Sequence, residues 1–180
     1  MSPEKEPQPK FNIEAMSLDD VEAATQMRTE CWLDTYINEE AGVSREWVEE
    51  WNRMQITPEK NAIRKERLND PGHNAGWVAK DSAGNIIGST TPFRHDDGRQ
   101  DIGSLYVKKE WHGKGVAASL MQKAIDWFDS SKPIELGVVK YNERAKAFYR
   151  KWGFEEIPDY EVLFADKLPE IRMIRKGGKS

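Results

Sequence analysis

The chain has little cysteine or histidine. Its single cysteine, Cys31, excludes an internal disulfide and fits a reducing compartment. Cys31 lies in an amphipathic helical pattern, so we expect a buried structural thiol rather than a nucleophile. The three histidines, His73, His95 and His112, are scattered without the close spacing of metal ligands, so no metal site is predicted.

Long apolar segments are also missing. No apolar run approaches the roughly 20 residues that span a bilayer, and the first ten residues lack the apolar core of a signal peptide. We therefore expect a cytoplasmic protein without a membrane partner. Residues 1–9 are expected to form a disordered extension. Residues 10–176 suit a single domain, whose core can draw on the seven tryptophans of the chain.

Charge is unevenly distributed along the chain. The formal net charge is −4, yet residues 1–60 hold 6 Lys and Arg against 14 Asp and Glu, whereas the remainder holds 21 against 17. The acidic first part argues against nucleic acid as a partner. The division would suit a polyanionic cofactor on the basic part and a cationic substrate on the acidic part. Solvated helix faces of either sign are the alternative interpretation.

The periodicity of apolar residues predicts an α/β domain with a mixed sheet. Its middle strands read as a meander of hairpins, and no G-x-G-x-x-G run occurs early in the chain, which argues against a Rossmann unit. Helices are expected to begin after the polar caps Ser17, Ser44, Thr57 and Asn142, and near Val116. The predicted strands cover residues 11–16, 76–80, 86–93, 100–107, 134–139, 154–164 and 170–175.

A glycine loop follows the fourth predicted strand. The strand ends in Leu105-Tyr-Val, the loop contains Gly113 and Gly115, and a helix begins near Val116. Glycines at such a junction let backbone N–H groups approach a ligand without Cβ clashes. Those N–H groups and the helix dipole favour an anion, above all a pyrophosphate. The loop therefore predicts a nucleotide-bearing cofactor.

A second motif lies about 25 residues beyond the loop. It reads Asn142-x-x-Ala145-x-x-Phe148-Tyr149, followed by Gly153-Phe154. Together with the loop His112-Gly-Lys-Gly-Val-Ala, it resembles the GCN5-related N-acetyltransferase (GNAT) superfamily, whose loop follows R/Q-x-x-G-x-G/A. The second motif matches at every position, whereas His112 replaces the usual Arg or Gln of the first.

The resemblance implies the GNAT fold and acetyl-CoA as co-substrate. In that fold about seven mostly antiparallel strands, flanked by helices, include two central parallel strands that splay apart, here 100–107 and 134–139. Pantetheine would bind the backbone of the first of these strands like an added strand, and the pyrophosphate would bind the glycine loop. The residues implied in cofactor binding are Leu105, Tyr106, Val107, His112, Gly113, Lys114, Gly115, Val116, Ala117, Ala118, Asn142, Ala145 and Tyr149.

The resemblance also implies a reaction in which a neutral amine attacks the thioester directly. A backbone N–H near Val107 would stabilise the oxyanion. Tyr149 takes the place of the general acid that protonates the departing thiolate. Asp101, at the start of the strand, takes the place of a general base that acts through water. A solvated carboxylate at the strand edge is the alternative interpretation of Asp101.

The acceptor is expected over the first two helices, at Trp32 and Tyr36. Aromatic residues there, with several nearby glutamates, suit a cation, although aromatic residues at helical spacing also pack in cores. We expect a primary amine, either a small cationic metabolite such as a polyamine or a protein or peptide N-terminus. A homodimer is considered as well. Two alternatives are a catalytically silent GNAT-fold module that binds CoA or a protein partner, and a nucleotide-binding regulatory domain.

Overall fold

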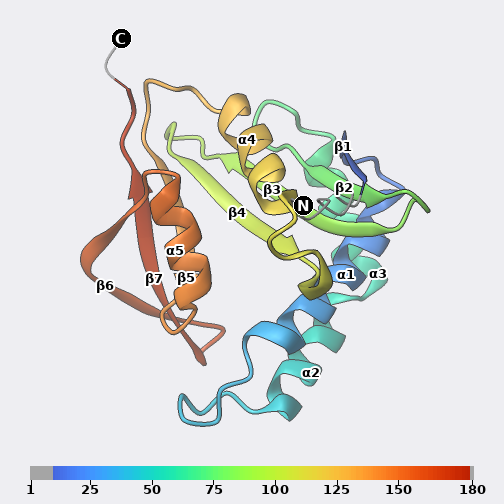
Figure 1. Cartoon of the computed structure of the whole chain (residues 1–180), viewed down its shortest axis with the longest axis vertical. Helices are drawn as coiled ribbons and strands as arrows, with labels where there is room; N and C mark the ends of the chain where they lie inside the picture. The colour runs from blue at the N-terminus through green and yellow to red at the C-terminus, as the bar shows by residue number, and fades with distance from the viewer. Residues whose placement is uncertain (1–9, 179–180) are drawn as a thin grey trace, which may run out of the picture.

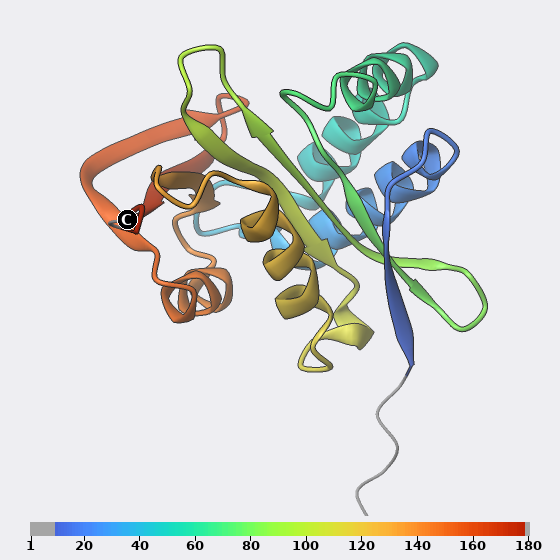
Figure 2. The ribbon, with the colours of Figure 1, turned by 90° about the horizontal axis from the view of Figure 1, so that it is seen from above.

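The computed structural model describes residues 10–178, so the extension expected at residues 1–9 lies outside the described part of the chain. Seven strands form one sheet in the order β1-β2-β3-β4-β5-β7-β6, with helices on both of its faces (Figure 1, Figure 2). The strands are β1 (Phe11–Ala15), β2 (Trp77–Asp81), β3 (Ile86–Arg94), β4 (Gln100–Val107), β5 (Ile134–Val139), β6 (Glu155–Phe164) and β7 (Leu168–Arg175). The helices are α1 (Asp20–Thr35), α2 (Arg45–Gln55), α3 (Pro58–Leu68), α4 (Val116–Trp127) and α5 (Glu143–Lys151), with a short 3-10 helix η1 (Lys109–Trp111). The predicted order of elements is confirmed.

Polar caps set the starts of α2 and α3, as the sequence predicts. The Ser44 hydroxyl accepts a hydrogen bond from the Trp47 N–H at 3.2 Å, and the Thr57 hydroxyl accepts one from the Lys60 N–H at 3.3 Å. Each cap satisfies a backbone donor that has no partner within its helix. Pro58 occupies the first position of α3, where a missing N–H costs nothing.

The two faces of the sheet carry different helices. Figure 2 shows α4 and α5 on one face, with α1 and α3 on the other. The core on the α4–α5 face joins Met121 of α4, Leu136 of β5 and Tyr149 of α5. On the other face α1 packs against β3 and β4, and Cys31 is buried at 5 % exposure. Burial raises the pKa of this thiol to about 12, which agrees with the predicted structural role.

Strands β4 and β5 run parallel but pair over only a short stretch. Their pairing covers Gln100–Ile102 and Ile134–Leu136. Beyond this point β4 continues along β3 to Val107, and β5 continues along β7 to Val139. The two strands therefore splay apart, as expected, and Figure 1 shows the gap between their ribbons.

A bulge in β4 lies where the splay begins. Thr90 of β3 pairs with Leu105, whereas Pro92 pairs with Ile102, so β4 has one residue more than β3 in this interval. Gly103 and Ser104 of β4 together lie opposite the single residue Thr91 of β3. A bulge of this kind bends the strand and increases its twist, which helps β4 turn away from β5. Within residues 10–178 no helix is long and apolar enough to cross a membrane.

Candidate active site

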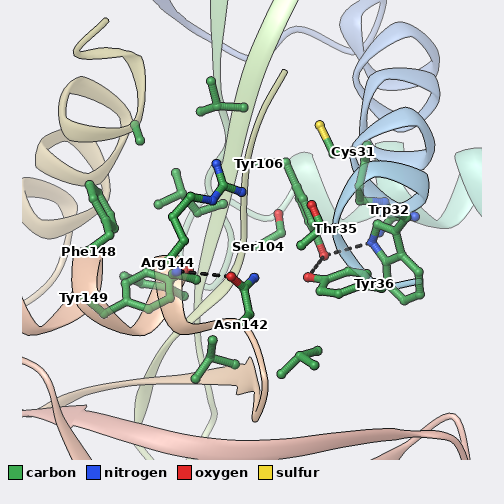
Figure 3. A pocket seen from close by; sticks show the side chains of 18 of the residues that line it. Cys31, Trp32, Thr35, Tyr36, Ser104, Tyr106, Asn142, Arg144, Phe148 and Tyr149 are labelled. Atoms are coloured by element: carbon green, nitrogen blue, oxygen red, sulfur yellow. Dashed lines mark hydrogen bonds between the residues drawn. The ribbon is translucent and has the colours of Figure 1, made fainter. Parts of the chain in front are cut away.

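A cavity of about 570 Å³ lies at the splay between β4 and β5. Its lining comes from α1, from β4 beyond Ile102, from the glycine loop, from the end of β5 and from α5, with further residues of β6 and β7. Figure 3 shows the α1 residues Cys31, Trp32, Thr35 and Tyr36 on one side and the α5 residues on the other. The cavity thus joins the two motifs that were identified separately in the sequence.

Strand β4 turns part of its backbone toward this cavity. The Lys108 N–H donates to the Ile87 carbonyl oxygen at 2.9 Å, in the same register as the end of the β3–β4 pairing. Antiparallel neighbours alternate between hydrogen-bonded and non-bonded pairs. The N–H and C=O groups of Leu105 and Val107 therefore point away from β3, and of these the Val107 C=O is bound by His112 at 2.9 Å. An extended ligand chain could pair with this exposed edge as an added strand would.

The glycine loop closes one end of the cavity. Gly113 has φ 76° and Gly115 has φ 86°, a left-handed conformation that residues with a Cβ rarely adopt. Gly115 is the N-cap of α4, so the first N–H groups of that helix have no partner within it. Ala117 and Ala118 also line the cavity. The junction can therefore accept an anion at a helix N-terminus.

Two of the predicted loop residues do not turn their side chains into the cavity. The Lys114 ammonium lies over the Trp111 ring, 5.2 Å from its centroid. Val116 is fully buried in the core formed with Leu120 of the same helix. Only the backbone of these two residues could contribute to a ligand site.

His112 is held by the backbone of β4. Its Nε2 lies 2.9 Å from the Val107 carbonyl oxygen, which requires the hydrogen on Nε2 and leaves Nδ1 as an acceptor. The guanidinium of Arg144 on α5 lies against the edge of this ring, next to Nδ1 and with Nη1 2.8 Å from Nε2. Burial, with a further contribution from Arg144, lowers the pKa of His112. The imidazole is therefore neutral near pH 7, and Arg144 supplies the fixed positive charge at this end of the cavity.

Arg144 was not singled out from the sequence. It occupies a variable position of the second motif, and the only signal was its place in the basic part of the chain. Its neighbours in the motif, Asn142 and Ala145, stabilise the start of α5. The Asn142 side chain caps α5 by accepting from the Ala145 N–H at 3.1 Å, and both residues line the cavity (Figure 3).

Tyr149 combines a packed ring with a place in the cavity lining. It is 8 % exposed, and its ring packs edge-on against Phe148 and Phe154, with centroids 5.6 and 6.0 Å away. Burial raises the pKa of the Tyr149 hydroxyl, and Tyr106 adds to the rise. The hydroxyl therefore stays protonated at neutral pH.

Asp101 is not brought into the cavity. It is 4 % exposed, and its Oδ2 lies 2.7 Å from Arg172 Nη2 and 3.2 Å from His95 Nε2. Asp101 pairs across the sheet with Glu135, in the stretch where β4 and β5 have not yet separated. The structure therefore does not support the expectation that Asp101 receives a proton in the cavity. It gives this carboxylate a buried ion pair instead.

A different carboxylate does reach the cavity. Glu170 lies on β7, opposite Val139 of β5, and among the described residues it is the only cavity-lining one with a carboxylate. Within residues 10–178, its carboxylate makes no side-chain hydrogen bond or ion pair, although its backbone pairs with β5 and β6. Burial raises the pKa of Glu170 and the nearby charge of Asp101 adds to this, whereas Arg172 opposes it.

The side chain of Glu170 depends on a glycine in the neighbouring strand. A Cβ added to Gly137 of β5 would lie 2.5 Å from Cδ of Glu170, closer than atoms can approach. A glycine inside an otherwise apolar strand often marks such a close approach. That glycine was the available sequence signal for Glu170.

The predicted acceptor residues Trp32 and Tyr36 line the cavity but are tied to β4. The Trp32 indole N–H donates to the Tyr106 hydroxyl at 2.9 Å, and the Tyr36 hydroxyl lies 3.4 Å from the same oxygen (Figure 3). Trp32 also stacks on Trp51, with centroids 6.1 Å apart. The nearby glutamates are exposed and do not line the cavity: Glu39, Glu40, Glu46, Glu49 and Glu50. These glutamates therefore do not join Trp32 and Tyr36 at the cavity.

Comparisons with known proteins identify relatives that match part of the chain. The chain is 40% identical over 76 residues to an uncharacterized N-acetyltransferase of Mycobacterium bovis and equally to its counterpart in Mycobacterium tuberculosis. The match covers 40% of this chain and 47% of those relatives, so the chain spans about half the length of the curated relatives it matches.

Solved structures share the fold. An N-acetyltransferase PaiA from Thermoplasma acidophilum, in complex with coenzyme A, superposes with a TM-score of 0.76 at 21% identity, over 93% of this chain and 99% of that one. A GNAT-family acetyltransferase from Staphylococcus aureus gives 0.69 at 18% identity, over 94% and 100%. The model of the acetyltransferase (GNAT) family matches residues 24–154. With its splayed strands, glycine loop and second motif, the chain belongs to the acetyltransferase (GNAT) family.

Proposed function

We propose that this protein transfers an acetyl group from acetyl-CoA to a primary amine. The observation that carries the proposal is the convergence on one cavity of the open β4 edge, the glycine loop and Tyr149. The neighbour from Thermoplasma acidophilum is a complex with coenzyme A, and the same ligand class suits these residues. The pantetheine would pair with Leu105 and Val107, and the pyrophosphate would meet the N-terminus of α4.

Arg144 and His112 take part in this proposal at the phosphate end. The family's usual Arg or Gln is replaced by a neutral His112 whose Nε2–H is engaged by Val107. The charge beside it comes from the guanidinium of Arg144. The pair would therefore restore the cationic contact that His112 alone lacks.

Glu170 is the base we propose for the amine. A general base works best when its pKa approaches the working pH, and burial moves the pKa of Glu170 in that direction. The amine nitrogen attacks the thioester carbon, and its proton passes to the Glu170 carboxylate, directly or through water. A backbone N–H of β4 near Val107 would stabilise the oxyanion.

Tyr149 is the proton donor we propose for the leaving group. As the bond between carbon and sulfur breaks, the thiolate receives the hydrogen bond and the proton of the Tyr149 hydroxyl. The proton held by Glu170 passes through solvent to the Tyr149 phenolate, which restores both groups, and the products are the amide and free CoA thiol. The raised pKa of Tyr149 ensures that the donor is protonated when the thiolate forms.

Two acceptor classes follow from the sequence, a small cationic metabolite such as a polyamine and a protein or peptide N-terminus. Both offer a primary amine to Glu170. The homodimer also stays a prediction, and sedimentation would measure it.

The test is a thiol-release assay with purified protein, acetyl-CoA and a panel of primary amines. We expect amine-dependent release of CoA thiol, with the acetylated amine identified by mass spectrometry. Calorimetry with acetyl-CoA is run alongside. Binding without thiol release from any amine would favour the silent GNAT-fold module instead. Binding of ATP or NAD in place of acetyl-CoA would favour a regulatory nucleotide-binding domain.

A further inference from the structure

A second cavity of about 530 Å³ lies under α1 and α3, against β3 and the bulge of β4. Three residues, Arg28, Gly103 and Ser104, line both this cavity and the first one. The partition between the two is therefore thin, and it consists of the β4 bulge and one long side chain. A Cβ on Gly103 would meet the Phe93 ring at 2.9 Å, so glycine is needed at this point.

Among the residues that the structure describes, the second cavity is lined by three arginines and by no carboxylate. Arg28 comes from α1, and Arg64 and Arg67 come from α3. Arg64 donates only to neutral acceptors, the Gln55 carbonyl oxygen at 2.8 Å, the Gln55 side chain at 3.2 Å and the Asn61 side chain at 3.1 Å. Within residues 10–178, no hydrogen bond or ion pair involves the guanidinium of Arg28 or Arg67.

Two of the three arginines, Arg28 and Arg64, are half-buried, whereas Arg67 is exposed. Burial, with the like charges of Arg28 and Arg67, lowers the pKa of Arg64 to about 10. Half-buried cations that serve only the fold are normally paired with a carboxylate. Guanidinium groups bind carboxylates and phosphates through paired N–H donors. The uncompensated charge therefore suits an anionic group that arrives with a ligand.

The remaining lining indicates what else that ligand carries. Met16, Val21, Ala24 and Leu68 supply apolar surface, and Thr25, Ser89 and Thr91 supply hydroxyl groups. Arg28, Gly103 and Ser104, which separate the two cavities, also line the cavity that contains Glu170. A ligand that spans both cavities would place its anion among the arginines and its other end near Glu170.

We propose that the acceptor is an amine that also bears an anionic oxygen group, a carboxylate or a phosphate-type group, and that Arg28, Arg64 and Arg67 bind this group in the second cavity. The inference rests on the proposed function for the amine end only. The proposed anion site distinguishes between the two acceptor classes. A polyamine would place a second cation against three arginines, whereas an amino acid or an acidic peptide end would match them.

The experiment compares matched acceptors of four to eight carbons. Each acceptor is a straight carbon chain with a primary amine at one end. Its other end is a methyl group, a second amine, a carboxylate or a phosphonate. The amino carboxylates or amino phosphonates should exceed the alkylamines and diamines in kcat/KM by about tenfold or more, the scale of one charged hydrogen-bond pair. The carboxylate and phosphonate arms show which anion is used. Equal kcat/KM across the set, with thiol release intact, would overturn the inference and leave the proposed function standing.

Binding is measured separately from turnover, without acetyl-CoA. The anionic acceptors should raise the thermal midpoint of the wild-type protein but not of Arg28→Gln or Arg67→Gln, and Arg28→Lys should retain part of the shift. Arg53→Gln, on the exposed side of α2, is the matched control and should respond like the wild type. Binding that depends on Arg28 and Arg67 in a protein with no transferase activity would support the inference and overturn the proposed function. Shifts of equal size in all variants would overturn the inference.

Discussion

The carboxyl group of Glu170 on β7 occupies the space that a side chain at residue 137 would fill on β5. A Cβ at Gly137 would lie 2.5 Å from Cδ of Glu170. This close approach directs a carboxylate across the sheet surface and into the cavity at the splay. Because residue 137 is a glycine, the Glu170 carboxylate of the neighbouring strand can reach the cavity, to which β5 itself contributes no acidic side chain.

Replacing this glycine should displace the carboxylate. In Gly137→Ala the added methyl group pushes the Glu170 side chain aside, and kcat should fall about a hundredfold, the scale of a misplacement of about 1 Å. The Kd for acetyl-CoA should change little, which calorimetry measures. Gly72→Ala is the control, because a Cβ there meets nothing closer than 3.6 Å. Unchanged kcat in Gly137→Ala would contradict the proposed role of Glu170.

Glu170→Gln should remove the proton acceptor while keeping the shape of the side chain. We expect kcat/KM to fall by about 10²- to 10⁴-fold. The wild-type rate should decline as the pH falls through the raised pKa of Glu170, because protonation removes the base. The groups that set this pKa are Arg172, which lowers it, and Asp101, which adds to the effect of burial. A pH–rate profile of Glu170→Gln should lack that acidic decline; an identical profile would assign it to another group.

The same substitution should stabilise the folded protein at neutral pH. A raised pKa means that the folded state disfavours the charged carboxylate. The contribution of Glu170 is therefore most favourable below its ordinary pKa and is lost as the pH rises through the folded value. Glu170→Gln should have a higher Tm than the wild type at pH 8, and the difference should vanish near pH 4. Glu39→Gln, an exposed change, should show no such trend, and a lower Tm for Glu170→Gln at pH 8 would refute the prediction.

Tyr149→Phe should separate the packing of the ring from the chemistry of the hydroxyl. The contacts with Phe148 and Phe154 survive the change, so the Tm should stay close to that of the wild type. Loss of the proton donor should lower kcat by about 10²- to 10⁴-fold, with acetyl-CoA binding retained. Full activity in this variant would exclude Tyr149 as the general acid.

Asp101→Asn should lower stability, and loss of its charge should lower the pKa of Glu170 and move the acidic decline of the rate to lower pH. Its side chain is 6 % exposed and bound to Arg172, which keeps Glu135 as a partner at 2.9 Å, so the change should cost about 1–3 kcal/mol. Urea titration should show this loss, whereas Asp97→Asn at an exposed pair should cost about 1 kcal/mol or less. An inactive but fully stable Asp101→Asn variant would restore Asp101 as the base expected from the sequence.

Much of the fold could be predicted because its signals are local. Helix caps such as Ser44 and Thr57 act within four residues, and apolar runs between turn residues indicate the strands. The positive φ of Gly113 and Gly115 likewise depends on the loop itself. These features do not require knowledge of which strands become neighbours.

The partners of the carboxylates could not be predicted in this way. Asp101 follows the family pattern in sequence, yet it lies just before the strands separate, where Arg172 binds it. Glu170 reaches the cavity through the register between β5 and β7. Both outcomes depend on where β4 diverges from β5, which is set by the bulge and by packing across the sheet.

The sequence by itself therefore determined the family, the order of the elements and the loop conformation that suits an anion, because each rests on neighbouring residues in the chain. Only the tertiary structure decided which acidic residue reaches the cavity and that Arg28, Arg64 and Arg67 face a common space. Those side chains come from β7, α1 and α3, which are far apart in the sequence. Their distances are set by sheet register and helix packing, and short-range patterns along the chain carry no information about either.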